Sequence, residues 1–184
     1  KPVAMAKPEA AAPKIALTET SGTSQLPDRA AFTDELRRRI AESQRFGAPI
    51  SIVHFRVKEY STLENNFGIA VGALLLDSLG AYITSTLRDM DLLGKLEAGD
   101  FVVMLPGSSA SAAKIVGQRV KTSISLCPIP LGAQQIRLDL DFGVASSQAD
   151  DDASSVMSRA KLEMESAAAV AATEATKHQA ALAA

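Results

Sequence analysis

The residues best suited to chemistry lie in a short acidic turn, Glu97-Ala98-Gly99-Asp100, between two apolar runs. Residues 91–96 can form one strand and residues 101–105, which begin at Phe101, a second one. The turn therefore has the length and the glycine of a hairpin loop. At such a tip the backbone is exposed, and a glycine lets a ligand approach closely. An ordinary hairpin with a solvated turn satisfies the same pattern, because loop glycines next to acids are frequent.

The composition indicates one ordinary folded domain. The chain has 184 residues, which is enough to bury a hydrophobic core. The net charge is -2, from Lys+Arg 19 and Asp+Glu 21, and it leaves no basic excess of the kind that binds nucleic acid or an anionic membrane surface. The single cysteine, Cys127, excludes an internal disulfide and fits a reducing compartment. We therefore expect a cytoplasmic module that binds no nucleic acid.

Metal and membrane sites are not expected either. The two histidines, His54 and His178, are far apart and stand in no Cys/His cluster, which argues against a structural zinc site. No apolar run reaches membrane-spanning length, and no signal peptide is visible. The first residue is Lys1 and not Met, which indicates a fragment of a longer protein that could carry upstream domains or an anchor.

Three regions follow one another along the chain. Residues 1–25 are rich in Ala, Pro, Ser and Thr and are predicted to be a flexible linker. Residues 26–166 are predicted to be the folded domain, and the alanine-rich residues 167–184 to extend its last helix or to fray. Within the domain, periodicity predicts helices over 32–45, 61–66, 70–86, 109–124 and a last one capped by Asp150-Asp151-Asp152. It predicts strands over 50–55, 91–96, 101–105 and 136–144.

The first predicted helix carries three consecutive arginines, Arg37, Arg38 and Arg39. Phe32 and Leu36 mark its apolar face, so the arginines lie largely on the other side. The simplest interpretation is a solvated helix face, and a nucleic-acid site is the less favoured alternative.

Several motifs, in the same order along the chain, resemble those of the GGDEF domain, the diguanylate cyclase family. The turn 97–101, followed by Leu105-Pro106-Gly107, resembles the Gly-Gly-Asp/Glu-Glu-Phe hairpin and its Leu-Pro-Gly end. Residues 26–32, 66–72 and 141–145 resemble Leu-Pro-Asn-Arg-x-x-Phe, x-Tyr-Gly-His-x-x-Gly and Ser-Ile-Gly-Val-Ala. The resemblance covers residues 26–166. It implies an α/β (α+β) domain of nucleotidyl-cyclase type, with a mostly antiparallel central sheet of about five strands flanked by helices.

The resemblance also implies where the family's chemistry would take place. The family joins two GTP molecules into cyclic di-GMP across a dimer, and two divalent ions are held by a strand aspartate and an acid in the turn. Arg56 matches that aspartate, and a cation there cannot ligate a metal. Other functional residues of the family are replaced as well. Glu97 and Ala98 stand in place of the two turn glycines, Glu64 and Ala73 in place of the residues that bind guanine, and Ser61 and Ala168 in place of lysines that bind phosphate. Asp100 alone does not form a two-metal site, so we expect no cyclase activity and no bound metal.

One binding motif of the family is kept. Five residues separate Asp91 of an Arg88-x-x-Asp91 motif from Glu97, and at this spacing the family has an inhibitory site for cyclic di-GMP. An arginine can donate two hydrogen bonds to phosphate or to the Hoogsteen edge of guanine, and an aspartate accepts from guanine N–H groups. Arg119 stands where members often add a second arginine. A weak surface ion pair at a helix end is the alternative interpretation of Arg88 and Asp91.

The first functional hypothesis is therefore a catalytically inactive GGDEF domain that binds cyclic di-GMP through Arg88, Asp91 and Arg119. It would report occupancy to an attached domain or to a partner protein. The second hypothesis is a pseudo-enzyme that binds no nucleotide and acts as a protein-interaction or dimerisation scaffold. Its first helix and the linker would form the interface of a homodimer. A third and weaker one is GTP binding without turnover, which the bulky Glu97 argues against.

Overall fold

The computed structural model describes residues 26–97, 99–131 and 134–182, and the side chains of 174–182 are outside the described part. Two regions named above fall outside it as well: the predicted linker, residues 1–25, and Ala98 of the turn. The same holds for the last two residues of the tail, 183–184.

The predicted order of helices and strands is confirmed, with two short strands added. The helices are α1 Arg29–Phe46, α2 Tyr60–Phe67, α3 Ile69–Thr86, α4 Ala110–Leu126 and α5 Ala153–Leu182. The strands are β1 Ile50–Val57, β2 Leu92–Lys95, β3 Asp100–Pro106, β4 Ile129–Leu131, β5 Gln134–Ile136 and β6 Leu140–Ser146. This is the α/β architecture that the sequence predicts.

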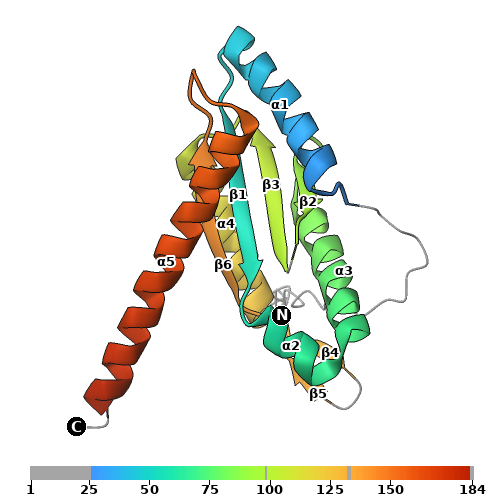
Figure 1. The fold of residues 1–184 in the computed structure, drawn as a ribbon, viewed down its shortest axis with the longest axis vertical. Helices are drawn as coiled ribbons and strands as arrows, with labels where there is room; N and C mark the ends of the chain where they lie inside the picture. Colours follow the sequence, from blue (N-terminus) through green and yellow to red (C-terminus); the bar gives the residue numbers. More distant parts are fainter. Residues whose placement is uncertain (1–25, 98, 132–133, 183–184) are drawn as a thin grey trace, which may run out of the picture.

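The central sheet has four antiparallel strands in the order β2-β3-β1-β6, and β4 and β5 form a separate two-stranded sheet. Alternate residues of β1 point to opposite faces of the sheet and enter two different cores. Ile52 packs in the core under α1 and α5, whereas Val53 and Phe55 pack in the core under α3 and α4. Figure 1 shows this arrangement of helices around the sheet.

The prediction of one continuous strand over residues 136–144 is wrong, because the chain leaves the strand conformation between β5 and β6. The preceding segment was predicted as a loop around Pro128 and Pro130, and it contains β4. The interruption lies at Asp139, whose side chain accepts from the N–H of Leu140 at 2.9 Å, while its carbonyl accepts from the N–H of Lys58 at 2.9 Å. These bonds replace a strand ladder at that position.

The helix ends follow the expected capping chemistry. Asp28 caps α1 and accepts from the N–H of Ala31 at 2.8 Å, and Gly47 ends α1 in the left-handed region with φ 73°. Asp152, in the predicted acidic cap, accepts from the N–H of Ser155 at 2.7 Å just before α5. The arginine run of α1 forms ion pairs along its own helix, with Asp34, Glu35 and Glu42.

Helix α5 lies directly on the edge strand β6. A Cβ atom at Gly143 would be 2.2 Å from the backbone nitrogen of Met164 and 2.3 Å from the carbonyl oxygen of Ala160, so only glycine permits this approach. The Glu163 carboxylate accepts from the N–H of Val144 at 2.7 Å, which occupies a donor that the edge of the sheet would otherwise leave unpaired. This packing holds α5 against β6 and close to β1, the neighbour of β6 in the sheet.

Helix α3 corrects one expectation about membranes. Within the ranges that the structure describes, it is the single helix long and apolar enough to cross a membrane by length and composition. In this fold its apolar residues Leu75, Leu79 and Ile83 are buried in the core under the sheet.

Candidate functional site

The acid of the signature turn, Asp100, is at the centre of a buried cluster of hydrogen bonds. β1 and β3 are antiparallel neighbours, and their register places Arg56 directly opposite Asp100. The Arg56 guanidinium donates twice to the carboxylate, from Nε to Oδ1 at 2.8 Å and from Nη2 to Oδ2 at 3.0 Å. His54 Nε2 lies 3.0 Å from Oδ2. A second and looser ion pair joins Arg56 to Glu165 of α5 at 3.5 Å.

These contacts determine the charge state of the cluster. Burial opposes ionisation of Asp100, but the hydrogen bonds from His54 and Arg56 outweigh it and hold the pKa of this carboxyl below its usual value. The hydrogen bond to Asp100 likewise raises the pKa of Arg56. Asp100 is therefore an ionised carboxylate whose oxygens are already engaged by a cation and an imidazole.

The acidic turn, with Asp100 next to a glycine, predicts an exposed side chain at this position. This prediction is wrong, because only 8% of the surface of Asp100 is exposed. His54 is a site residue that the sequence pattern did not identify. The available signal was a polar residue between the apolar strand residues Val53 and Phe55, since a buried polar side chain needs a partner.

The remaining residues of the turn have separate roles. Glu97 is exposed and lies 4.0 Å from Arg29, while Phe101 is fully buried in the core. Gly99 has φ 83°, and a Cβ there would be 2.9 Å from Cγ of Tyr60, so the turn closes against this ring only with glycine. The carbonyl of Gly99 also accepts from the N–H of Val57 at 3.1 Å.

Glu64, at one of the two positions predicted to have lost a guanine reader, lies against α3. A Cβ at Gly72 of α3 would lie 2.8 Å from Cγ of Glu64 and 3.1 Å from the Tyr60 hydroxyl oxygen, so α2 packs closely on α3 there. Burial, together with a hydrogen bond to Glu64, raises the pKa of Tyr60 to about 12. Across the described residues, no group of three or more His, Cys, Asp or Glu side chains could hold a metal ion.

The second candidate site, at Arg88 and Asp91, is a tight turn between α3 and β2. The Arg88 N–H donates to Oδ2 of Asp91 at 2.9 Å, and the Asp91 N–H donates to the carbonyl of Arg88 at 2.9 Å. From α4, Nη2 of Arg119 donates to the carbonyl of Thr86 at 3.0 Å, at the last residue of α3. The fold thus brings Arg119, which is 33 positions away from Thr86, to the start of this turn.

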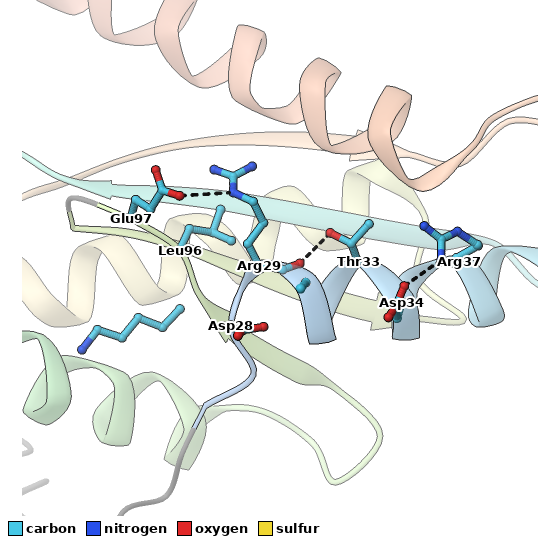
Figure 2. A pocket seen from close by; sticks show the side chains of 9 residues that line it. Asp28, Arg29, Thr33, Asp34, Arg37, Leu96 and Glu97 are labelled. Carbon is cyan, nitrogen blue, oxygen red and sulfur yellow. Dashed lines mark hydrogen bonds and ion pairs between the residues drawn. The ribbon is translucent and has the colours of Figure 1, made fainter.

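A third feature is a cavity of about 610 Å³ between the start of α1 and the β2–β3 hairpin. Figure 2 shows Arg29 directed toward Glu97 and Arg37 toward Asp34, at 4.0 and 2.7 Å. Lys95, the third cation of the lining, lies 2.7 Å from Asp77. Each cation here has an acidic neighbour, so the cavity offers little net charge to a ligand.

Comparisons with known proteins agree with this architecture. The family described as "Diguanylate cyclase, GGDEF domain" matches residues 21–172. Diguanylate cyclase DgcP of Pseudomonas aeruginosa is 23% identical over 141 residues, which are 77% of this chain and 21% of that protein. Diguanylate cyclase A of Treponema denticola is 29% identical over 112 residues, 60% of this chain and 30% of that protein. The chain thus spans a fifth to a third of the length of these two relatives.

Solved structures show the same fold. The P. aeruginosa diguanylate cyclase SiaD, in complex with its activator SiaC, superposes with a TM-score of 0.75 at 23% identity, over 79% of this chain and 56% of that one. The coiled coil and GGDEF domain of DgcB from Caulobacter crescentus, in complex with c-di-GMP, superposes with a TM-score of 0.71 at 19% identity, over 76% and 75%. Because the family match covers most of the chain, including the turn and the sheet around it, this chain belongs to the GGDEF domain family.

Proposed function

We propose that this domain is a catalytically silent member of the GGDEF family that binds cyclic di-GMP at Arg88, Asp91 and Arg119. The observation that carries the proposal is the bond from Arg119 to the carbonyl of Thr86, because it holds a second guanidinium beside the Arg88–Asp91 turn. Two arginines and one carboxylate around one turn match the phosphates and guanine edges of a cyclic dinucleotide.

The hydrogen bonds already present leave capacity for a ligand. Arg119 uses one of its donors on Thr86, and a guanidinium has five. Asp91 uses Oδ2 on the N–H of Arg88, so Oδ1 remains as an acceptor for guanine. Arg88 is exposed and forms no ion pair within the described ranges, so its fork is available. The turn is closed before the ligand arrives, which reduces the entropy lost on binding.

Catalytic silence is supported by the cluster around Asp100. A magnesium ion requires carboxylate oxygens, and both oxygens of Asp100 accept bonds from Arg56. A metal would have to displace a bidentate ion pair and then tolerate the guanidinium beside it. We therefore propose that the domain needs no metal and makes no cyclic di-GMP. A cytoplasmic location is proposed with it, because the chain has a single cysteine, as fits a reducing compartment.

The test is isothermal titration calorimetry with cyclic di-GMP in EDTA. Saturable binding is expected, and GTP should bind much more weakly. Arg88→Ala should weaken binding by about 2–4 kcal/mol, because it removes a charge-assisted contact. Arg45→Ala is the matched control, since Arg45 is an exposed arginine in the last turn of α1, outside the proposed site. An unchanged affinity of Arg88→Ala would refute the site.

One observation favours the alternative function, a protein-interaction scaffold. Leu162 and Val170 are 61% and 59% exposed on α5, eight positions apart, which places them about 80° apart around the helix axis and within one broad face of the helix. A relative, SiaD, has been solved with a protein activator. If no heat is seen at hundreds of micromolar cyclic di-GMP, which corresponds to about -5 kcal/mol, the scaffold function would replace the first proposal. Sedimentation would then show whether the partner is a second copy.

A further inference from the structure

A second cavity, of about 220 Å³, lies between α1 and α5 on the sheet face that carries the Asp100 cluster. Two cationic side chains line it, Arg29 from α1 and Lys161 from α5. Three hydroxyls and one imidazole complete its polar lining: Thr33, Ser154, Ser158 and His54. No carboxylate is among the described residues that line it. The cavity is smaller than the roughly 300–1,000 Å³ of sites for drug-sized ligands, but it has room for a small ion with water.

His54 gives this cavity an unusual polar group. The ring is 3% exposed, and its Nδ1 atom is buried with no hydrogen-bond partner within the described part of the chain. Because Asp100 is an ionised acceptor, the other nitrogen, Nε2, must carry the proton of their shared bond. His54 is itself one of the residues that line the cavity. An unpaired buried nitrogen is costly, and a ligand or water that bonds to it removes that cost.

The Thr33 hydroxyl already donates to the carbonyl of Arg29 at 2.6 Å, but the two cations and the two serine hydroxyls around the cavity are only loosely engaged. Arg29 and Glu97 are 4.0 Å apart, as are Lys161 and Glu165, and such solvent-exposed pairs contribute little. The hydroxyls of Ser154 and Ser158 form no hydrogen bond within the ranges described. Donors from two helices are thus available at one point, where a negative charge would be favourable.

We propose that this cavity is a binding site for a phosphate-sized oxyanion, held by Arg29, Lys161 and the serine hydroxyls and seated on His54. A metal cation is disfavoured there by two positive side chains. The site is separate from the Arg88–Asp91 turn, and it does not require the cyclic di-GMP proposal. It adjoins the Asp100 cluster through His54, which contacts Asp100, and through Glu165, which lies near both Lys161 and Arg56, so an anion there would be sensed by the degenerate turn.

The test is NMR of the imidazole resonances of the two histidines during titration with sodium sulfate, which stays doubly negative throughout, against sodium chloride at equal ionic strength. The resonances of His54 should shift saturably at millimolar sulfate, and those of His178 should not. Inorganic phosphate and glycerol phosphate form two further arms. Equal affinity identifies a free oxyanion as the ligand, and tighter glycerol phosphate identifies a phosphomonoester.

The variants are a matched pair of serines. Ser158→Asp puts a carboxylate into the cavity and should reduce sulfate affinity at least tenfold, whereas Ser111→Asp, at an exposed position of α4, adds the same charge elsewhere and should not. Both serines are exposed, so the fold is expected to survive in both proteins. The proposal is overturned if His54 shows no saturable shift, if His178 shifts in parallel, or if the two variants lose affinity equally. Binding of cyclic di-GMP is measured separately and does not enter these outcomes.

Discussion

Removing the Asp100 carboxylate should destabilise the fold, although the residue lies in a turn. Asp100→Ala deletes three hydrogen bonds, two from Arg56 and one from His54. It leaves the His54 ring buried with neither nitrogen bonded in the described part of the chain. Hydrogen bonds to charged groups contribute about 1.5–3 kcal/mol each, and loss of one partner of a buried pair costs about 3–5 kcal/mol.

The full sum of these hydrogen-bond energies does not apply to Asp100→Ala, because the Arg56 side chain is 36% exposed. Water and Glu165 can take over part of its hydrogen bonding, so we expect a loss of about 2–4 kcal/mol in the free energy of unfolding. Asp100→Asn keeps an acceptor and should lose less. Glu97→Ala is the control in the same turn, because Glu97 is 85% exposed and its only ion pair in the described part is at 4.0 Å; its change should stay within about 0.5 kcal/mol.

The assay is urea unfolding followed by far-UV circular dichroism, since the chain contains no tryptophan. The pH dependence provides a second test. The pKa of Asp100 is lower in the folded state than its usual 3.8, so its stabilising effect is complete above that value and is lost as the pH falls through the lower, folded pKa. The gap between parent and Asp100→Ala should therefore narrow below about pH 4. If Asp100→Ala and Glu97→Ala have the same free energy of unfolding at neutral pH, the hydrogen bonds of Asp100 with Arg56 and His54 do not stabilise the turn.

Three further outcomes are expected. Gly143→Ala should prevent folding or lower the melting temperature strongly, because its methyl group would meet backbone atoms of Met164 and Ala160 at 2.2 and 2.3 Å; a melt within a few degrees of the parent would contradict the packing of α5. Arg119→Lys should weaken cyclic di-GMP binding by about 1–2 kcal/mol, since a lysine cannot bond the carbonyl of Thr86 and the ligand as a planar fork does, and calorimetry would detect this. Incubation of the domain with GTP and manganese should yield no cyclic di-GMP by chromatography, and any turnover would disprove catalytic silence.

Much of the architecture was predictable because its causes are local. Alternation along β1 separates Ile52 from Val53 and Phe55, and it thereby assigns two faces to the central sheet. Asp28 and Asp152 cap helices because a side chain beside a helix start finds N–H groups within three residues. Such preferences are visible in a short window of sequence.

Local patterns were misleading where distant partners decided the outcome. Residues 136–144 alternate like one strand, but Asp139 is bonded by its neighbour Leu140 and by Lys58 of the loop after β1, and the strand is interrupted there. The length and composition of α3 satisfy the requirements of a membrane span, and only its packing shows that its apolar side forms part of a core. Local spacing contains no information about these partners.

The same division holds for the candidate sites. The sequence by itself determined that Arg56 is a cation, that Asp100 is an acid of the turn, and that an Arg88-x-x-Asp91 motif precedes this turn. The match of Arg56 and Asp100 to the family's metal positions stays a prediction from the resemblance. Only the tertiary structure decided that Arg56 and Asp100, 44 positions apart, meet in a buried ion pair over His54. It also decided that Arg119 reaches the end of α3. The physical reason is that sheet register and helix packing bring distant residues together, and their burial then gives charge pairs a strength that composition and spacing cannot predict.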